Sequence, residues 1–189
     1  MTLPDFSLQF PASDIAALAG RYRYSTDVGP IRELAPKVHE RGCLTKADLL
    51  AVGQWKSPRT VPKIAKNEEA LIVEATRLAL STPHERLRIG TLTLLHGVGY
   101  PMASVILHWC HTDRYPIIDY RALWSLGAAE PPAAYSFNYW QSYVTICRHL
   151  AGDAGIDMRT LDRALWQYSK ENQPPKKNTS KCPVETLED

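Results

Sequence analysis

The 189-residue sequence has no long apolar run and few cysteines. Its longest apolar stretch is about residues 102–109, far short of the ~20 residues that cross a bilayer. The first ten residues lack the basic and apolar regions of a signal peptide. Four cysteines are present without a CxxC pair: Cys43, Cys110, Cys147 and Cys182. We therefore expect a cytoplasmic protein (nucleoid-associated in a bacterium) with reduced thiols, and neither structural zinc nor an iron–sulfur cluster.

Net charge is also nearly absent, at +2, but the charges are unevenly distributed. Residues 21–66 contain ten Lys or Arg against four Asp or Glu, whereas the rest of the chain contains twelve against sixteen. A basic segment in a near-neutral protein suits a phosphate-rich partner. A solvated basic face is the alternative. The 44% hydrophobic and 22% charged residues exclude collagen-like, mostly disordered and disulfide-dense chains.

No run of alternating apolar and polar residues indicates a strand, so the predicted class is all-α. Thr45 and Asp48 resemble a capping box, and Asn67 is expected to cap the helix that follows it. Residues 1–171 are expected to form one helical domain, and 172–189 a disordered tail whose lysines are either solvated or in weak contact with nucleic acid. The expected helices cover about residues 14–18, 30–40, 46–51, 68–79, 83–95, 101–109, 119–127, 137–150 and 158–168.

The most informative segment is a Gly-Val-Gly turn between two expected helices, a hairpin over about residues 86–108. Gly97 and Gly99 allow backbone conformations closed to other residues and remove side chains from the turn. The next helix can then present free N–H groups to an anion such as a phosphate. Val98 is expected to pack back between the helices, and Pro101 suits the first helical turn. A plain helix connection is the alternative.

An aspartate follows the hairpin at a defined distance. Asp119 lies twenty residues after Gly99, behind the apolar run 115–118 and two residues before Arg121. Upstream, residues 52–59 (VGQWKSPR) form a Gly-aromatic-basic turn. Over roughly residues 25–128 the chain resembles the helix-hairpin-helix DNA glycosylase superfamily, which includes endonuclease III, MutY and AlkA, as a short and divergent member.

The resemblance implies a compact two-lobed helical bundle and a monofunctional DNA N-glycosylase of base excision repair. Such an enzyme hydrolyses the N-glycosidic bond of a flipped, damaged or modified base. Asp119 would stabilise the oxocarbenium-like sugar or orient the attacking water; a simple helix cap is its alternative role. Pro101 stands where strand-cutting relatives carry a nucleophilic lysine, so no lyase activity is implied. His96 also departs from the family, which often has proline there.

The resemblance also implies a DNA interface. The residues expected at the DNA backbone are Gly97, Val98, Gly99, Tyr100, Met102, Ala103, Ser104, Lys56, Arg59 and Arg121. The residues expected in the base pocket are Trp55, Tyr100, Tyr120 and Trp124, with Trp140 as a further candidate. Core packing of the aromatic rings and solvation of the charges are the alternatives. The expected partner is double-stranded DNA, bound by a monomer without membrane contact.

No cofactor is expected beyond a monovalent cation held by hairpin carbonyls, such as those of Leu95 and Gly97, when DNA is bound. His108, Cys110 and His111 lack a fourth ligand at regular spacing, so no metal site is predicted there. The alternative function is a non-catalytic helix-hairpin-helix module that binds DNA or RNA. Such a module needs the hairpin but no carboxylate. The sequence does not name the base.

Overall fold

The computed structural model describes residues 5–23 and 29–175, and this part of the chain is all-α, as predicted, without strands. Two short 3-10 helices, η1 (Ala12–Asp14) and η2 (Pro58–Thr60), accompany the α-helices. The α-helices are α1 (Ile15–Arg21), α2 (Gly29–Arg41), α3 (Lys46–Lys56), α4 (Val61–Ile64), α5 (Glu69–Ser81), α6 (Glu85–Thr93), α7 (Tyr100–Cys110), α8 (Tyr120–Ser125), α9 (Phe137–Asp153) and α10 (Met158–Asn172).

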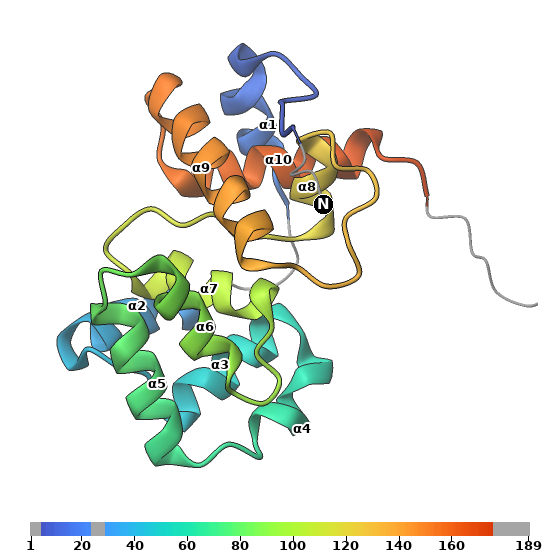
Figure 1. Ribbon diagram of the computed structural model, residues 1–189. Coiled ribbons are helices and arrows are strands. Elements are labelled where there is room, and N and C mark those ends of the chain that lie inside the picture. The colour runs from blue at the N-terminus through green and yellow to red at the C-terminus, as the bar shows by residue number, and fades with distance from the viewer. Residues whose placement is uncertain (1–4, 24–28, 176–189) are drawn as a thin grey trace, which may run out of the picture.

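The helices lie in two groups (Figure 1). One group contains α2 to α7, in which α7 contacts α2, α3 and α6. The other contains α1 and α8 to α10, in which α10 contacts α1, α8 and α9. The chain therefore builds the second group from both of its ends, and the ion pair between Arg21 and Glu171 (2.8 Å) joins the two end helices.

The predicted helix caps are confirmed in part. Thr45 accepts a hydrogen bond from the Asp48 N–H, and the Asp48 carboxylate accepts one from the Thr45 N–H, which completes the capping box. The prediction for Asn67 is wrong, because α5 begins at Glu69 and its N-cap position is Glu68, whose side chain makes no capping hydrogen bond. Asn67 instead binds the hairpin. The predicted tail falls on residues 172–189, most of which lie outside the described residues.

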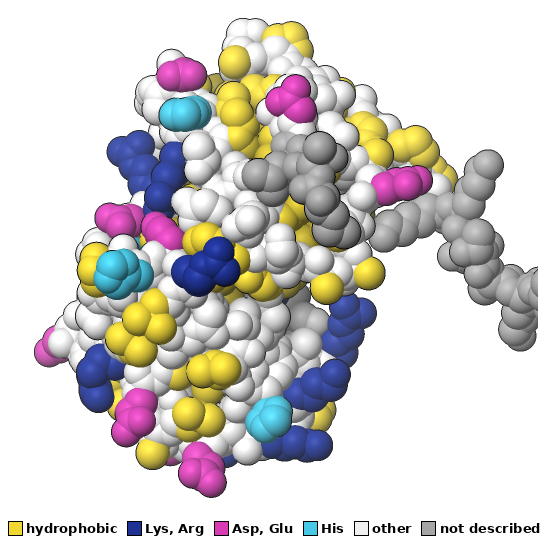
Figure 2. Space-filling view, in the orientation of Figure 1, with side chains coloured by type: hydrophobic (Ala, Val, Ile, Leu, Met, Phe, Trp, Pro, Cys, Tyr) yellow, Lys and Arg dark blue, Asp and Glu magenta, His cyan; other side chains and the backbone are white. Residues whose placement is uncertain are grey.

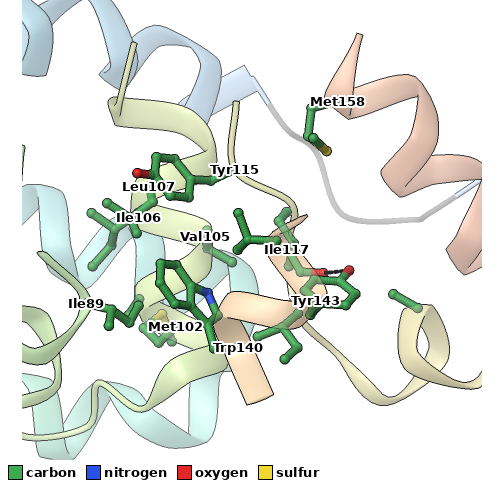
Figure 3. Packing of buried hydrophobic residues seen from close by; sticks show 14 of the residues in the cluster. Ile89, Met102, Val105, Ile106, Leu107, Tyr115, Ile117, Trp140, Tyr143 and Met158 are labelled. Carbon is green, nitrogen blue, oxygen red and sulfur yellow. Dashed lines mark hydrogen bonds between the residues drawn. The ribbon is translucent and has the colours of Figure 1, made fainter. Parts of the chain in front are cut away.

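The core continues from one helix group to the other through α9 and the segment before α8. Trp140 is fully buried and stacks on Tyr115, with the ring centroids 6.0 Å apart. Tyr143 donates a hydrogen bond from its hydroxyl to the Ile117 carbonyl (2.9 Å), as Figure 3 shows beside Val105 of α7. Trp140 is therefore a core residue and not part of a base pocket. These contacts fix the backbone that leads into α8.

The described cysteines, Cys43, Cys110 and Cys147, are free and buried, whereas Cys182 lies outside the described residues. Burial raises the pKa of the Cys110 thiol to about 12. None of the helices in residues 5–23 and 29–175 is long and apolar enough to cross a membrane.

Two buried histidines predict a pH dependence of stability. Burial lowers the pKa of His108, whose Nδ1–H donates to the Tyr115 carbonyl, and burial with the nearby Arg88 guanidinium lowers the pKa of His111. The unfolded chain therefore takes up these protons first as the pH falls below about 6.5. We expect the free energy of unfolding to decrease there, by at most about 1.4 kcal/mol per pH unit for each histidine.

Urea unfolding at pH 7.5, 6.5 and 5.5 measures this dependence. The double variant His108→Gln/His111→Gln is expected to show a flatter profile than the wild type over the same range. A wild-type stability that stays constant or rises between pH 6.5 and 5.5 would contradict the assignment.

Candidate functional site

Residues from both helix groups line a cavity of about 590 Å³. Its walls come from the end of α3, from η2, from the hairpin, from the start of α8 and from α10. The predicted site residues that it brings together are Lys56, Arg59, Gly97, Gly99, Met102, Asp119, Tyr120 and Arg121. Segments that are distant in the sequence therefore meet at the predicted carboxylate.

The two carboxylate oxygens of Asp119 have different partners. Its Oδ1 accepts hydrogen bonds from the N–H groups of Arg121 (2.9 Å) and Ala122 (3.0 Å), which caps α8. Its Oδ2 lies 3.6 Å from the Nζ atom of Lys56. The side chain is 22% exposed, so it reaches solvent without lying on the open surface. The capping role and the functional role are thus compatible in one side chain.

Two hydrogen bonds hold the backbone that carries Asp119. The Ser104 hydroxyl accepts from the Ile118 N–H (3.1 Å) and donates to the Pro101 carbonyl (2.9 Å). Tyr143 holds the preceding carbonyl, that of Ile117. The backbone just before Asp119 is therefore tied directly to the hairpin helix α7 and to α9. This rigid support is what a carboxylate needs if it is to act at a fixed point.

Three residues of the predicted DNA interface have buried side chains. The side chains of Val98, Ala103 and Ser104 are buried, with exposures of 4%, 0% and 0%. Val98 packs back into the core, as predicted. Ser104 positions the aspartate segment and does not face the cavity. These three side chains are therefore not available to DNA, and the predicted contact at these positions stays a prediction for their backbone groups.

The two glycines of the hairpin have different roles. Gly97 has φ +81°, and a Cβ atom there would lie 2.9 Å from Ile64 Cγ1 and 3.1 Å from the Ile64 backbone nitrogen. Gly99 has φ −96°, which any residue can adopt, and a Cβ atom there would meet only Pro101, at 3.8 Å. Gly97 is required by the fold. The expectation that Gly99 needs a special backbone conformation is wrong, because its φ is open to any residue and a Cβ atom would fit there.

The Asn67 side chain holds the hairpin through hydrogen bonds, a role that the sequence did not reveal. The residue is 2% exposed, and its amide donates to the carbonyls of His96 (3.0 Å) and Ile64 (2.9 Å). Its Oδ1 accepts from the His96 N–H (2.8 Å). Three hydrogen bonds from one buried side chain thus fix the entry to the Gly-Val-Gly turn.

Replacing Asn67 with alanine is expected to lower the free energy of unfolding by about 2–4 kcal/mol, because three hydrogen bonds are lost and backbone groups at His96 and Ile64 lose a partner. Chemical denaturation measures the change, with Asn138→Ala on the exposed face of α9 as the matched control. Equal, small effects of the two substitutions would show that Asn67 does not hold the hairpin.

The cavity is rich in cations. Lys56, Arg59 and Arg121 line it together with Asp119. The Arg121 guanidinium lies over the rings of Tyr120 (5.2 Å) and Trp166 (5.1 Å) and donates to the Ser169 hydroxyl (3.4 Å). Such a guanidinium keeps donors available for a phosphate or an aromatic base.

A second groove of about 460 Å³ runs along the outer side of the hairpin, where Lys63 and His96 line it. It shares Thr60 and both hairpin glycines with the large cavity. Figure 2 shows basic side chains along the edge of the molecule that carries α4. The hairpin, the basic edge and the carboxylate therefore lie along one continuous surface.

The predicted base-pocket residues separate into different places. Tyr120 lines the large cavity, whereas Trp55 packs edge-on against Trp109 (6.3 Å) and lines a small adjoining cavity of about 70 Å³. Tyr100 lies against Trp140 (6.4 Å) and Trp124 against Tyr168 (5.7 Å). Neither of these two lines the large cavity.

Tyr135 and Trp166 line the large cavity but were not predicted. A signal for Trp166 exists, because Arg159, Asp162 and Trp166 recur at helical spacing and form one wall of the small cavity. Burial raises the pKa of Asp162 and of Tyr135. No comparable signal marks Tyr135, which lies in the Pro-rich connection to α9.

Comparison of the chain with known protein families, curated proteins and solved structures finds no match. Among the described residues no group of three or more His, Cys, Asp or Glu side chains is arranged to hold a metal ion. His108 and His111 bond to the Tyr115 carbonyl and the Asp113 N–H, respectively. Function is therefore inferred from the geometry of the cavity itself.

Proposed function

We propose that the protein is a DNA N-glycosylase that removes a flipped, damaged or modified base from double-stranded DNA. The observation that carries this proposal is the position of Asp119. One of its oxygens caps a helix, the other lies 3.6 Å from Lys56 Nζ, and the residue lines a cation-rich cavity bordered by a glycine hairpin. The two helix groups with the cavity between them fit the two lobes that the resemblance to helix-hairpin-helix glycosylases implies.

The hairpin is proposed to bind the DNA backbone. Gly97 and Gly99 line both the cavity and the outer groove, so no side chain separates a phosphate from the turn. The turn leads into the eleven-residue helix α7, whose N-terminal end favours an anion. Arg59 and Lys63 flank the same edge and would add contacts that weaken with salt.

The chemistry is proposed to occur at Asp119. Breaking an N-glycosidic bond builds positive charge on the sugar, and a carboxylate beside the anomeric carbon stabilises that charge or orients the attacking water. A volume of about 590 Å³ lies within the usual range for a small-ligand pocket. Tyr120 and Trp166 provide aromatic faces beside it for a base. The protein would need no metal for this reaction.

A binding module without activity is the second candidate, and the position of Asp119 argues against it. A carboxylate inside a cavity that binds phosphates repels them and lowers affinity, and the cap of α8 needs only an uncharged side-chain oxygen such as that of asparagine. The two candidates differ in one product, which is the free base.

Release of a free base tests the proposal. Duplexes carrying uracil, hypoxanthine, 7-methylguanine, 3-methyladenine, 8-oxoguanine or an A:8-oxoguanine pair are incubated with the protein, and the released bases are measured by mass spectrometry. The proposal expects release from at least one duplex. Salt-sensitive DNA binding without release from any of them would favour the binding module.

A further inference from the structure

Lys56 is the only lysine among the described residues that lines the large cavity. It is the last residue of α3, its side chain is 19% exposed, and its Nζ lies 3.6 Å from Asp119 Oδ2. The other cations in this wall, Arg59 and Arg121, are arginines. The amine therefore lies where the sugar of a bound nucleotide would meet the carboxylate.

A lysine at this place differs in chemistry from the arginines around it. A guanidinium stays protonated and serves to bind anions, whereas an amine can lose a proton and attack a carbonyl carbon. The Lys56 side chain is also partly buried beside Asp119 and does not lie on the solvated surface. On that surface, an ion pair would contribute little to stability. Phosphate binding alone therefore does not account for a half-enclosed amine beside the carboxylate.

We propose that Lys56 forms an imine with the abasic sugar and cleaves the DNA strand on its 3′ side. This inference rests on the proposed function, because the abasic site is the product of base removal. In this proposal α3 supplies the amine, because the hairpin position that lines the same cavity is Pro101, which has no side-chain amine. The proposal therefore departs from the expectation, drawn from Pro101, of an enzyme that leaves the strand intact.

The proposed steps balance without an oxidant or reductant. The Lys56 ammonium gives a proton to the Asp119 carboxylate, and the neutral amine adds to the aldehyde at C1′ of the open-chain abasic sugar. Asp119 then returns the proton to the departing hydroxide, so that water leaves, the imine is protonated and the carboxylate is ionised again. The Asp119 carboxylate removes a proton from C2′, and that electron pair forms the C2′–C3′ double bond. The C3′–O bond breaks, and its electron pair leaves with the phosphate. Water then hydrolyses the imine and restores the amine.

Reductive trapping on a ready-made abasic duplex tests this proposal. Borohydride converts the imine into a stable amine, so wild-type protein is expected to give a covalent protein–DNA complex on a denaturing gel. Lys56→Arg keeps the positive charge but is expected to reduce the complex to background. The matched control is Lys37→Arg on the exposed side of α2, a lysine that lines neither the large cavity nor the outer groove and is expected to trap like the wild type.

Peptide mapping of the trapped wild-type complex is expected to place the DNA on Lys56, and this result holds even if the Lys56 variant folds poorly. Attachment at another amine, undiminished trapping by a folded Lys56→Arg variant, or no complex with the wild type would overturn the proposal. Base release without trapping would overturn the proposed imine step but still support the proposed glycosylase function. Trapping at Lys56 without release of any base would support this step and count against the proposed function.

Discussion

Replacing Asp119 with asparagine is expected to slow base release by about 10²–10⁴-fold, as measured in single-turnover reactions with the substrate duplex. A neutral amide neither stabilises a cationic sugar nor takes a proton from water. Asparagine is nevertheless a good helix cap, and its side-chain oxygen can still accept from the N–H groups of Arg121 and Ala122. The substitution should therefore remove the chemistry and leave α8 in place.

Asp157→Asn is the matched control, because Asp157 caps α10 in the same way, through the Thr160 N–H, and does not line the cavity. This variant should release base at the wild-type rate. Affinity of Asp119→Asn for duplex DNA should stay the same or increase, because a negative charge leaves the proposed phosphate-binding surface. A wild-type rate in Asp119→Asn, or an equal loss in both variants, would contradict the role assigned to Asp119.

Gly97→Ala is expected to lower the free energy of unfolding by about 2–4 kcal/mol and to abolish tight DNA binding. About 1–2 kcal/mol comes from the positive φ, and the overlap with Ile64, including its backbone nitrogen, adds a similar amount. Chemical denaturation and fluorescence anisotropy with a labelled duplex measure the two effects.

Gly99→Ala separates the fold from DNA binding at the same turn. Its methyl group meets only Pro101, at 3.8 Å, so stability should stay within about 0.5 kcal/mol of the wild type. The methyl group lies where the backbone of DNA is proposed to approach, so affinity should fall. If Gly99→Ala binds DNA as the wild type does, the turn is a helix connection and not a phosphate site.

The sequence was sufficient for the helical class and for the place of Asp119 because both depend on local signals. The lack of strand alternation and the helix-breaking residues predicted the class. An aspartate behind an apolar run predicted a helix start, and Asp119 caps α8. The capping box at Thr45 is equally local.

Long-range partners were not predictable in the same way. Asn67 precedes acidic residues and resembles a cap, but its side chain turns toward His96, and no local pattern distinguishes the two uses. Lys56 and Trp166 reach Asp119 from helices far away in the sequence. Ser104 lies on a helix whose buried face could not be separated from its exposed face, because nearly every residue of α7 is apolar.

Binding of a charged sugar mimic tests the central claim most directly, because it does not require the excised base to be known. One duplex carries a pyrrolidine in place of the nucleotide, which mimics the cationic sugar, and another carries a neutral tetrahydrofuran. The wild type should bind the pyrrolidine duplex at least about 100-fold more tightly, and Asp119→Asn should lose this preference. Equal affinity of the wild type for the two duplexes would contradict a catalytic carboxylate at Asp119.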